Sequence, residues 1–185
     1  MTDRVILGID PGTVIMGYGL IHVKGSKLNL MKCDIIRLEK HEDHATRLKI
    51  IFEEVIKIIE THSPDELAIE APFFGKNVQS MLKLGRAQGV AIAAALSRNL
   101  PIFEYSPKKI KQSITGNGNA SKEQVSAMLQ SLLDVKELHK YLDASDALGA
   151  AVCHYFQSKS PGGGTIKQSY SGWKAFLTDN PKRKG

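Results

Sequence analysis

The chain has 185 residues, of which 42% are hydrophobic and 24% charged, and its formal net charge is +6 at pH 7. This length suits one domain, which buries enough apolar surface to fold without a disulfide or a structural metal. No apolar run is long enough to span a membrane, and no signal segment stands at the N-terminus, so we expect a cytoplasmic protein. The two cysteines and six histidines stand in no zinc-binding spacing.

The positive charge is concentrated in two segments. Residues 71–122 contain eight lysines and arginines against one acidic residue, and residues 159–185 contain six against one. The segments 1–70 and 123–158 are acidic, each with a net charge of −3. Such large differences in net charge between segments favour a phosphate-binding face over an evenly mixed surface. A chance distribution of surface charge is the competing explanation.

Hydrophobic periodicity predicts an α/β fold with a five-stranded mixed sheet flanked by helices. The first three strands have short links, which indicate an antiparallel meander. Apolar residues from Leu48 to Ile59 fall on one face of an amphipathic helix. In chain order the expected elements are strands at 4–9, 17–23 and through 35–36, a helix at 45–62, a strand at 67–70, a helix at 77–98, a strand at 101–105, and helices at 107–114, 121–133 and 143–157.

The helix at 77–98 carries a further expectation. It is small or apolar at almost every position from Ala87 to Leu96, which is typical of a helix buried in the core or in a subunit contact. Gly85 and Gly89 lie one turn apart and would allow a close backbone approach at that contact.

The C-terminal segment differs in composition from the rest. Ser-Pro-Gly-Gly-Gly at 160–164 breaks any helix, and the residues that follow are polar and basic. We therefore predict one domain at 1–158 and a flexible basic tail at 159–185.

Four carboxylates stand where acidic residues are poor structural choices. Asp10 and Glu70 end two predicted buried strands, and Asp143 and Asp146 lie three residues apart on one face of the last helix. If the two strands are neighbours, their ends lie about 5 Å apart, and carboxylates that converge in this way need a cation. Mg²⁺ is the natural choice, and two such ions can clamp a phosphodiester during hydrolysis. Taken singly, Asp10 also fits a tight turn, and the other two aspartates fit the start of a helix.

The residues around these carboxylates resemble the four motifs of the RuvC family of Holliday junction resolvases. The resemblance covers about residues 1–158, keeps the family's order and spacing, and is most specific in the second motif. The matching segments are Gly-Ile-Asp-Pro-Gly-Thr at 8–13 with Gly-Tyr-Gly at 17–19; Ala-Ile-Glu at 68–70 with Phe73, 76–77 and 82–91; 111–112, 116–118 and 120–125; and Asp-Ala-Ser-Asp-Ala-Leu at 143–148.

This resemblance implies a ribonuclease-H-like fold and a homodimer. It also implies an endonuclease that resolves four-way DNA junctions by paired, symmetric, Mg²⁺-dependent cleavage during recombination and repair. Two ions per subunit are implied, with Mn²⁺ as a substitute. The expected partners are four-way junction DNA, a second copy of the chain, and a branch-migration complex of the RuvA and RuvB type.

The resemblance also assigns residue roles. The four carboxylates become the catalytic metal ligands, with Asp10 between both ions. Lys111 and Lys122 match basic residues near the scissile phosphate, where positive charge stabilises the transition state, and Lys122 is counted as catalytic. Phe73 matches an aromatic residue that stacks on a base. Three further basic residues are expected to contact DNA phosphates: Lys76, Lys83 and Arg86. For each lysine a solvated surface position is the alternative, and for Phe73 it is core packing.

Three other functions compete with this one. Sugar-kinase and actin-like ATPases also open on Gly-Ile-Asp-x-Gly-Thr, but they need two such domains, and ATP hydrolysis would identify them. A non-catalytic junction-binding module would bind four-way DNA without cutting it in Mg²⁺. A general ribonuclease-H-type nuclease would share the acidic cluster and cut RNA–DNA hybrids, but it lacks the helix over 85–91 and the implied dimer.

Overall fold

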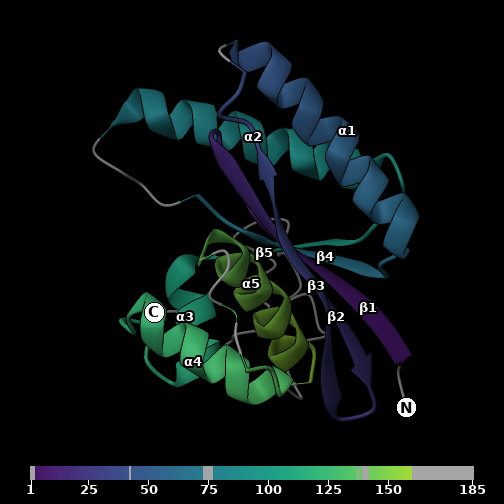
Figure 1. Cartoon of the computed structure of the whole chain (residues 1–185), viewed down its shortest axis with the longest axis vertical. Coiled ribbons are helices and arrows are strands. Elements are labelled where there is room, and N and C mark those ends of the chain that lie inside the picture. The colour runs from purple at the N-terminus through teal and green to yellow at the C-terminus, as the bar shows by residue number, and fades with distance from the viewer. Residues whose placement is uncertain (1–2, 42, 73–76, 137, 139–141, 160–185) are drawn as a thin grey trace, which may run out of the picture.

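A five-stranded mixed sheet forms the centre of the protein (Figure 1). The computed structural model describes residues 3–41, 43–72, 77–136, 138 and 142–159. The sheet order is β3-β2-β1-β4-β5, in which β1, β2 and β3 pair antiparallel while β4 and β5 run parallel to β1. This order confirms the predicted meander. The strands are β1 (Asp3–Asp10), β2 (Ile15–Lys24), β3 (Lys27–Arg37), β4 (Glu66–Glu70) and β5 (Ile102–Tyr105).

Helices cover both faces of the sheet (Figure 1). One face carries α1 (His44–His62) and α2 (Val78–Leu96), and the other carries α3 (Pro107–Thr115), α4 (Lys122–Leu133) and α5 (Leu142–Lys159). Side chains alternate along β1, so Leu7 joins the core beneath α1 and α2 while Ile6 joins the core beneath α3, α4 and α5. Among the described residues, no helix is both long and apolar enough to cross a membrane.

Side-chain caps set the helix starts. The Asp43 carboxylate accepts a hydrogen bond from the Thr46 backbone N–H at 2.7 Å and begins α1. At α4, Ser121 and Gln124 form a reciprocal capping box, in which each side chain accepts from the other residue's backbone N–H. These caps satisfy backbone N–H groups that have no partner within the helix.

Helix α2 buries one face and exposes another. Its alanines from Ala87 to Ala95 include four that are buried against the sheet and α1. Val78, Leu82 and Leu96 are 65%, 52% and 58% exposed. Within this chain only one side of α2 meets the core, so the predicted alternative of a subunit contact stays a prediction for the other side. An apolar outer face remains.

Helix α5 lies directly on the central strands, and a glycine makes this possible. A Cβ added at Gly8 on β1 would come within 2.0 Å of the Ala147 carbonyl oxygen on α5. The helix backbone therefore occupies space that any other residue at position 8 would fill. This contact holds the N-terminal part of α5, including Asp146, over the sheet.

Candidate active site

Two of the predicted carboxylates end neighbouring parallel strands. Asp10 is the last residue of β1, and Glu70 is the last residue of β4. β1 and β4 pair in parallel with Ile9 opposite Ile69, so the two acidic residues follow at the same edge of the sheet. Adjacent strands lie about 5 Å apart, which places the two carboxylates close together. The condition on which the predicted convergence depends, that the two strands are neighbours, is therefore met.

A pocket of about 300 Å³ gathers acidic and basic side chains at this edge. Helix α5 contributes Asp146, α3 contributes Lys111 and α4 contributes Lys122. The full lining is Asp10, Glu70, Pro107, Ile110, Lys111, Lys122, Val125 and Asp146. Five residues that were singled out from the sequence thus meet in one pocket.

Among the groups that line the pocket, Glu70 has a strongly shifted pKa. Burial raises the pKa of the Glu70 carboxyl to about 7, and the nearby Asp146 carboxylate adds to the rise, while Lys122 and Lys111 oppose it. Lys122 Nζ lies 2.6 Å from Asp146 Oδ2, in an ion pair that is partly open to solvent. The pocket therefore holds closely spaced carboxylates with a lysine partner at its rim.

The donor set suits a hard divalent cation. No group of three or more histidine, cysteine, aspartate or glutamate side chains is assembled as a metal centre in the part of the chain that the structure describes, and the Asp143 side chain lies outside that part. Three carboxylates nevertheless line one pocket, and a cation among them would offset both the burial of Glu70 and its repulsion by Asp146. Oxygen donors of this kind favour Mg²⁺ or Mn²⁺ over Zn²⁺.

The remaining predicted residues lie away from the pocket or outside the described residues. Lys83 and Arg86 are exposed on α2, and neither lines the pocket. Phe73 and Lys76 fall outside the described residues, so their predicted DNA contacts remain predictions. Asp143 lies in the first turn of α5.

Sequence reasoning missed two parts of the site's surroundings. The pocket walls include Pro107 and Ile110 of α3, which the motifs did not single out. His154 of α5 is buried and pairs with Glu66 of β4, although nothing in its local sequence marks it. The sequence does offer one sign of this pairing: side chains alternate along a strand, so Glu66 lies on the same face of β4 as Glu70.

Comparisons with known proteins agree on one family. The sequence model of the family described as crossover junction endodeoxyribonuclease RuvC matches residues 6–154. A protein of that description from Cytophaga hutchinsonii is 62% identical over 181 residues, which cover 98% of this chain and 88% of the relative. One from Christiangramia forsetii is 60% identical over 182 residues, covering 98% and 93%.

Solved structures agree with the sequence comparisons. The structure of Thermus thermophilus RuvC in complex with a Holliday junction substrate aligns with a TM-score of 0.79 at 31% identity, covering 84% of this chain and 94% of that one. The yeast mitochondrial Holliday junction resolvase Ydc2, at 14% identity and a TM-score of 0.60, supports the fold alone. The predicted ribonuclease-H-like fold is confirmed. This chain belongs to the RuvC family of crossover junction endodeoxyribonucleases.

Proposed function

We propose that this endonuclease resolves four-way DNA junctions by paired, symmetric, Mg²⁺-dependent hydrolysis during recombination and repair in the cytoplasm. The observation that carries the proposal is the 300 Å³ pocket, in which three strand-end and helix carboxylates meet two lysines. RuvC nucleases are metal-dependent, and the oxygen donors of the pocket suit two Mg²⁺ ions per subunit, with Mn²⁺ as a substitute.

The residues of the pocket divide the work of hydrolysis. Asp10, Glu70 and Asp146 of the pocket, together with Asp143 in the first turn of α5, would hold the metal ions. When bound, such ions supply a deprotonated water and neutralise charge on the phosphate. Lys122 and Lys111 add positive charge to the same pocket and would stabilise the negative charge that grows on the phosphate in the transition state.

Contacts with DNA outside the pocket belong to the same proposal. Exposed Lys83 and Arg86 lie three residues apart on α2 and would follow the phosphate backbone, with Lys76 preceding them. Phe73 would stack on a base near the point of strand exchange. The predicted tail at 159–185, with six basic residues against one acidic, would add salt-sensitive affinity.

Paired cleavage needs two active sites, and the outer face of α2 supports a homodimer. Leu82 and Leu96 are more than half exposed on that face. A Cβ at Gly85 or Gly89 would meet nothing within 4 Å, so no part of the described chain approaches α2 there. A second copy packed on this face would bury the exposed apolar side chains and use the glycines for close approach. The RuvA and RuvB type branch-migration complex is the further partner we propose.

The proposal is tested by comparing substrates and metals. Purified protein is given a mobile four-way junction, a linear duplex and an RNA–DNA hybrid, each in Mg²⁺ and in Ca²⁺. We expect symmetric, ligatable nicks in the junction in Mg²⁺ and little cutting of the other substrates. Asp10→Asn and Glu70→Gln should each lower cleavage by more than about 10²-fold. Glu53→Gln, at an exposed position of α1, is the matched control.

Other results would favour the competing functions. Equal cutting of junction and duplex would remove junction selectivity. Preferential cutting of the hybrid would indicate a general ribonuclease-H-type nuclease. Junction binding without any cleavage in Mg²⁺ would identify a binding module, and unchanged cleavage by the Asp10 and Glu70 variants would refute the assigned site.

A further inference from the structure

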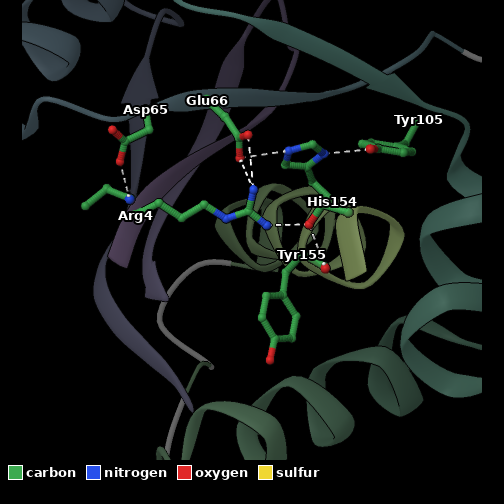
Figure 2. A network of polar contacts seen from close by, with 8 residues as sticks. Arg4, Asp65, Glu66, Tyr105, His154 and Tyr155 are labelled. Atoms are coloured by element: carbon green, nitrogen blue, oxygen red, sulfur yellow. Dashed lines mark hydrogen bonds and ion pairs between the residues drawn. The ribbon is translucent and has the colours of Figure 1, made fainter. Parts of the chain in front are cut away.

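A chain of polar side chains joins β1, β4, β5 and α5 within the fold (Figure 2). His154 of α5 is only 3% exposed, and its Nε2 lies 3.0 Å from Glu66 Oε2 on β4. Its Nδ1 lies 2.7 Å from the Tyr105 hydroxyl on β5. Arg4 of β1 contacts both Glu66 carboxylate oxygens through one guanidinium nitrogen, at 3.1 and 2.9 Å. None of these four residues lines the pocket described above.

With a neutral imidazole, the contacts of this chain admit one arrangement of protons. The Glu66 carboxylate accepts from Arg4, so it also accepts from the Nε2–H of His154. Burial lowers the pKa of His154, and the neutral ring then uses Nδ1 to accept from the Tyr105 O–H. Phe103 stacks on the same imidazole with ring centroids 4.1 Å apart. The imidazole is therefore fixed in position and in tautomer.

The Glu66–His154 contact and the Glu70–Asp146 pair connect the same two elements. Side chains alternate along β4, so Glu66 and Glu70 both face α5, and their backbone separation is about 13 Å. Asp146 and His154 are eight residues apart on α5, or about 12 Å along the helix axis. The helix and the strand therefore meet at two points with closely matched spacing, one inside the pocket and one beyond it.

Apolar packing holds one part of α5 against β1 and β2, where its backbone at Ala147 lies over Gly8 and its Leu148 side chain lies over Gly19. His154 lies about two helical turns beyond Ala147. Its hydrogen bond to Glu66 is a directional contact with β4. The polar chain therefore adds a fixed point on β4 to the packing on β1 and β2.

We infer that His154 is a positioning residue for the active site: its hydrogen bond to Glu66 fixes the register and rotation of α5 on β4, and so places Asp146 against Glu70. This inference rests on the proposed catalytic role of the pocket. The imidazole does not line the pocket. Its loss should therefore weaken metal binding and the chemical step, and leave junction binding intact.

The test uses the full chain with His154→Leu and His154→Gln. Gln keeps an amide nitrogen near the place of Nε2, so it retains the donor to Glu66, whereas Leu removes it. We expect His154→Leu to lower the single-turnover cleavage rate of a saturating four-way junction by about 10–10²-fold, as an error of about 1 Å in the reacting groups does. Calorimetry should show weaker Mn²⁺ binding to His154→Leu, while its junction affinity in Ca²⁺ should stay within about twofold of the wild type. His154→Gln should restore most of the lost cleavage rate and most of the lost Mn²⁺ affinity.

Val55→Ala is the matched control, because Val55 of α1 is fully buried on the other side of the sheet. It should lower the melting temperature as His154→Leu does and leave cleavage at 25 °C nearly unchanged. If His154→Leu does not fold, Tyr105→Phe and His154→Gln decide the question by the same readouts.

The outcomes separate this inference from the proposal beneath it. Equal cleavage losses in His154→Leu and Val55→Ala would overturn the positioning role, as would a loss of junction affinity as large as the loss of cleavage. Asp146→Asn tests the pocket itself. Full activity in Asp146→Asn would refute the assigned site, whereas an inactive Asp146→Asn beside an unaffected His154→Leu would refute the positioning role alone.

Discussion

Replacing Gly8 by alanine perturbs the contact between α5 and β1 in a way that the structure allows us to quantify. The added Cβ would lie 2.0 Å from the Ala147 carbonyl oxygen, and real Cβ atoms essentially never approach closer than 3.0 Å, so α5 or β1 must move by about 1 Å. Overpacking of this kind costs about 1–3 kcal/mol, which outweighs the gain of about 0.5–1 kcal/mol from removing a strand glycine.

The displacement has two measurable consequences. For a chain of this length, the net cost should lower the melting temperature by a few degrees, at about 2–4 °C per kcal/mol. Because Asp146 precedes Ala147, a shift of about 1 Å also moves a carboxylate of the pocket, and cleavage should fall by up to about 10²-fold. The assays are thermal unfolding and single-turnover cleavage of a four-way junction.

Val55→Ala is the control, because it destabilises the core on the other side of the sheet without touching α5. It should lower the melting temperature and leave cleavage at 25 °C nearly unchanged. A Gly8→Ala protein with wild-type melting temperature and wild-type cleavage would refute the reasoning, since it would mean that α5 tolerates the displacement without moving the carboxylates.

Three further predictions concern the site, the fold and the dimer. Lys122→Ala should lower cleavage by about 10²–10³-fold, because it removes positive charge beside the phosphate. It should shift the melting temperature little, because the ion pair of Lys122 with Asp146 is partly exposed. Cleavage rate and melting temperature are measured on the same preparation. Burial lowers the pKa of His154 below its ordinary value near 6.5, so the unfolded chain binds a proton that the folded protein excludes, and the contribution of His154 to the free energy of unfolding should fall as the pH drops below about 6.5. The raised pKa of Glu70, about 7, gives a slope of the opposite sign in the same window. Urea unfolding between about pH 7.5 and 5.5 should therefore show the His154 contribution as the difference in slope between the wild type and His154→Gln. Leu82→Glu should shift the protein to monomer in sedimentation, whereas Met128→Glu on α4 should not.

Much of the active site could be predicted from the sequence because its signals are local. Asp10 and Glu70 each follow a short apolar run, so their place at strand ends is readable without any knowledge of the partner strand. The antiparallel meander followed from short links alone. Once β1 and β4 are neighbours, the meeting of the two carboxylates follows from strand geometry.

The parts that could not be predicted depend on contacts between distant segments. Glu66 and His154 are 88 residues apart, and neither stands in a motif that announces the other. The sequence left open whether the outer face of α2 is buried in the core or in a subunit contact, because an apolar helix looks the same in both cases.

The charge pattern of the sequence follows from how the chain returns to the pocket. The acidic segment 1–70 contains both strand-end carboxylates and ends at Glu70, and the basic segment 71–122 begins there and returns through α3 to the start of α4. Two of its lysines, Lys111 and Lys122, line the same pocket as the carboxylates. A DNA phosphate is attracted most strongly where positive side chains converge, and here that place is also where the proposed metal ligands meet. The same net charge of +6 spread evenly over the surface would attract DNA without directing a phosphate to the reaction site.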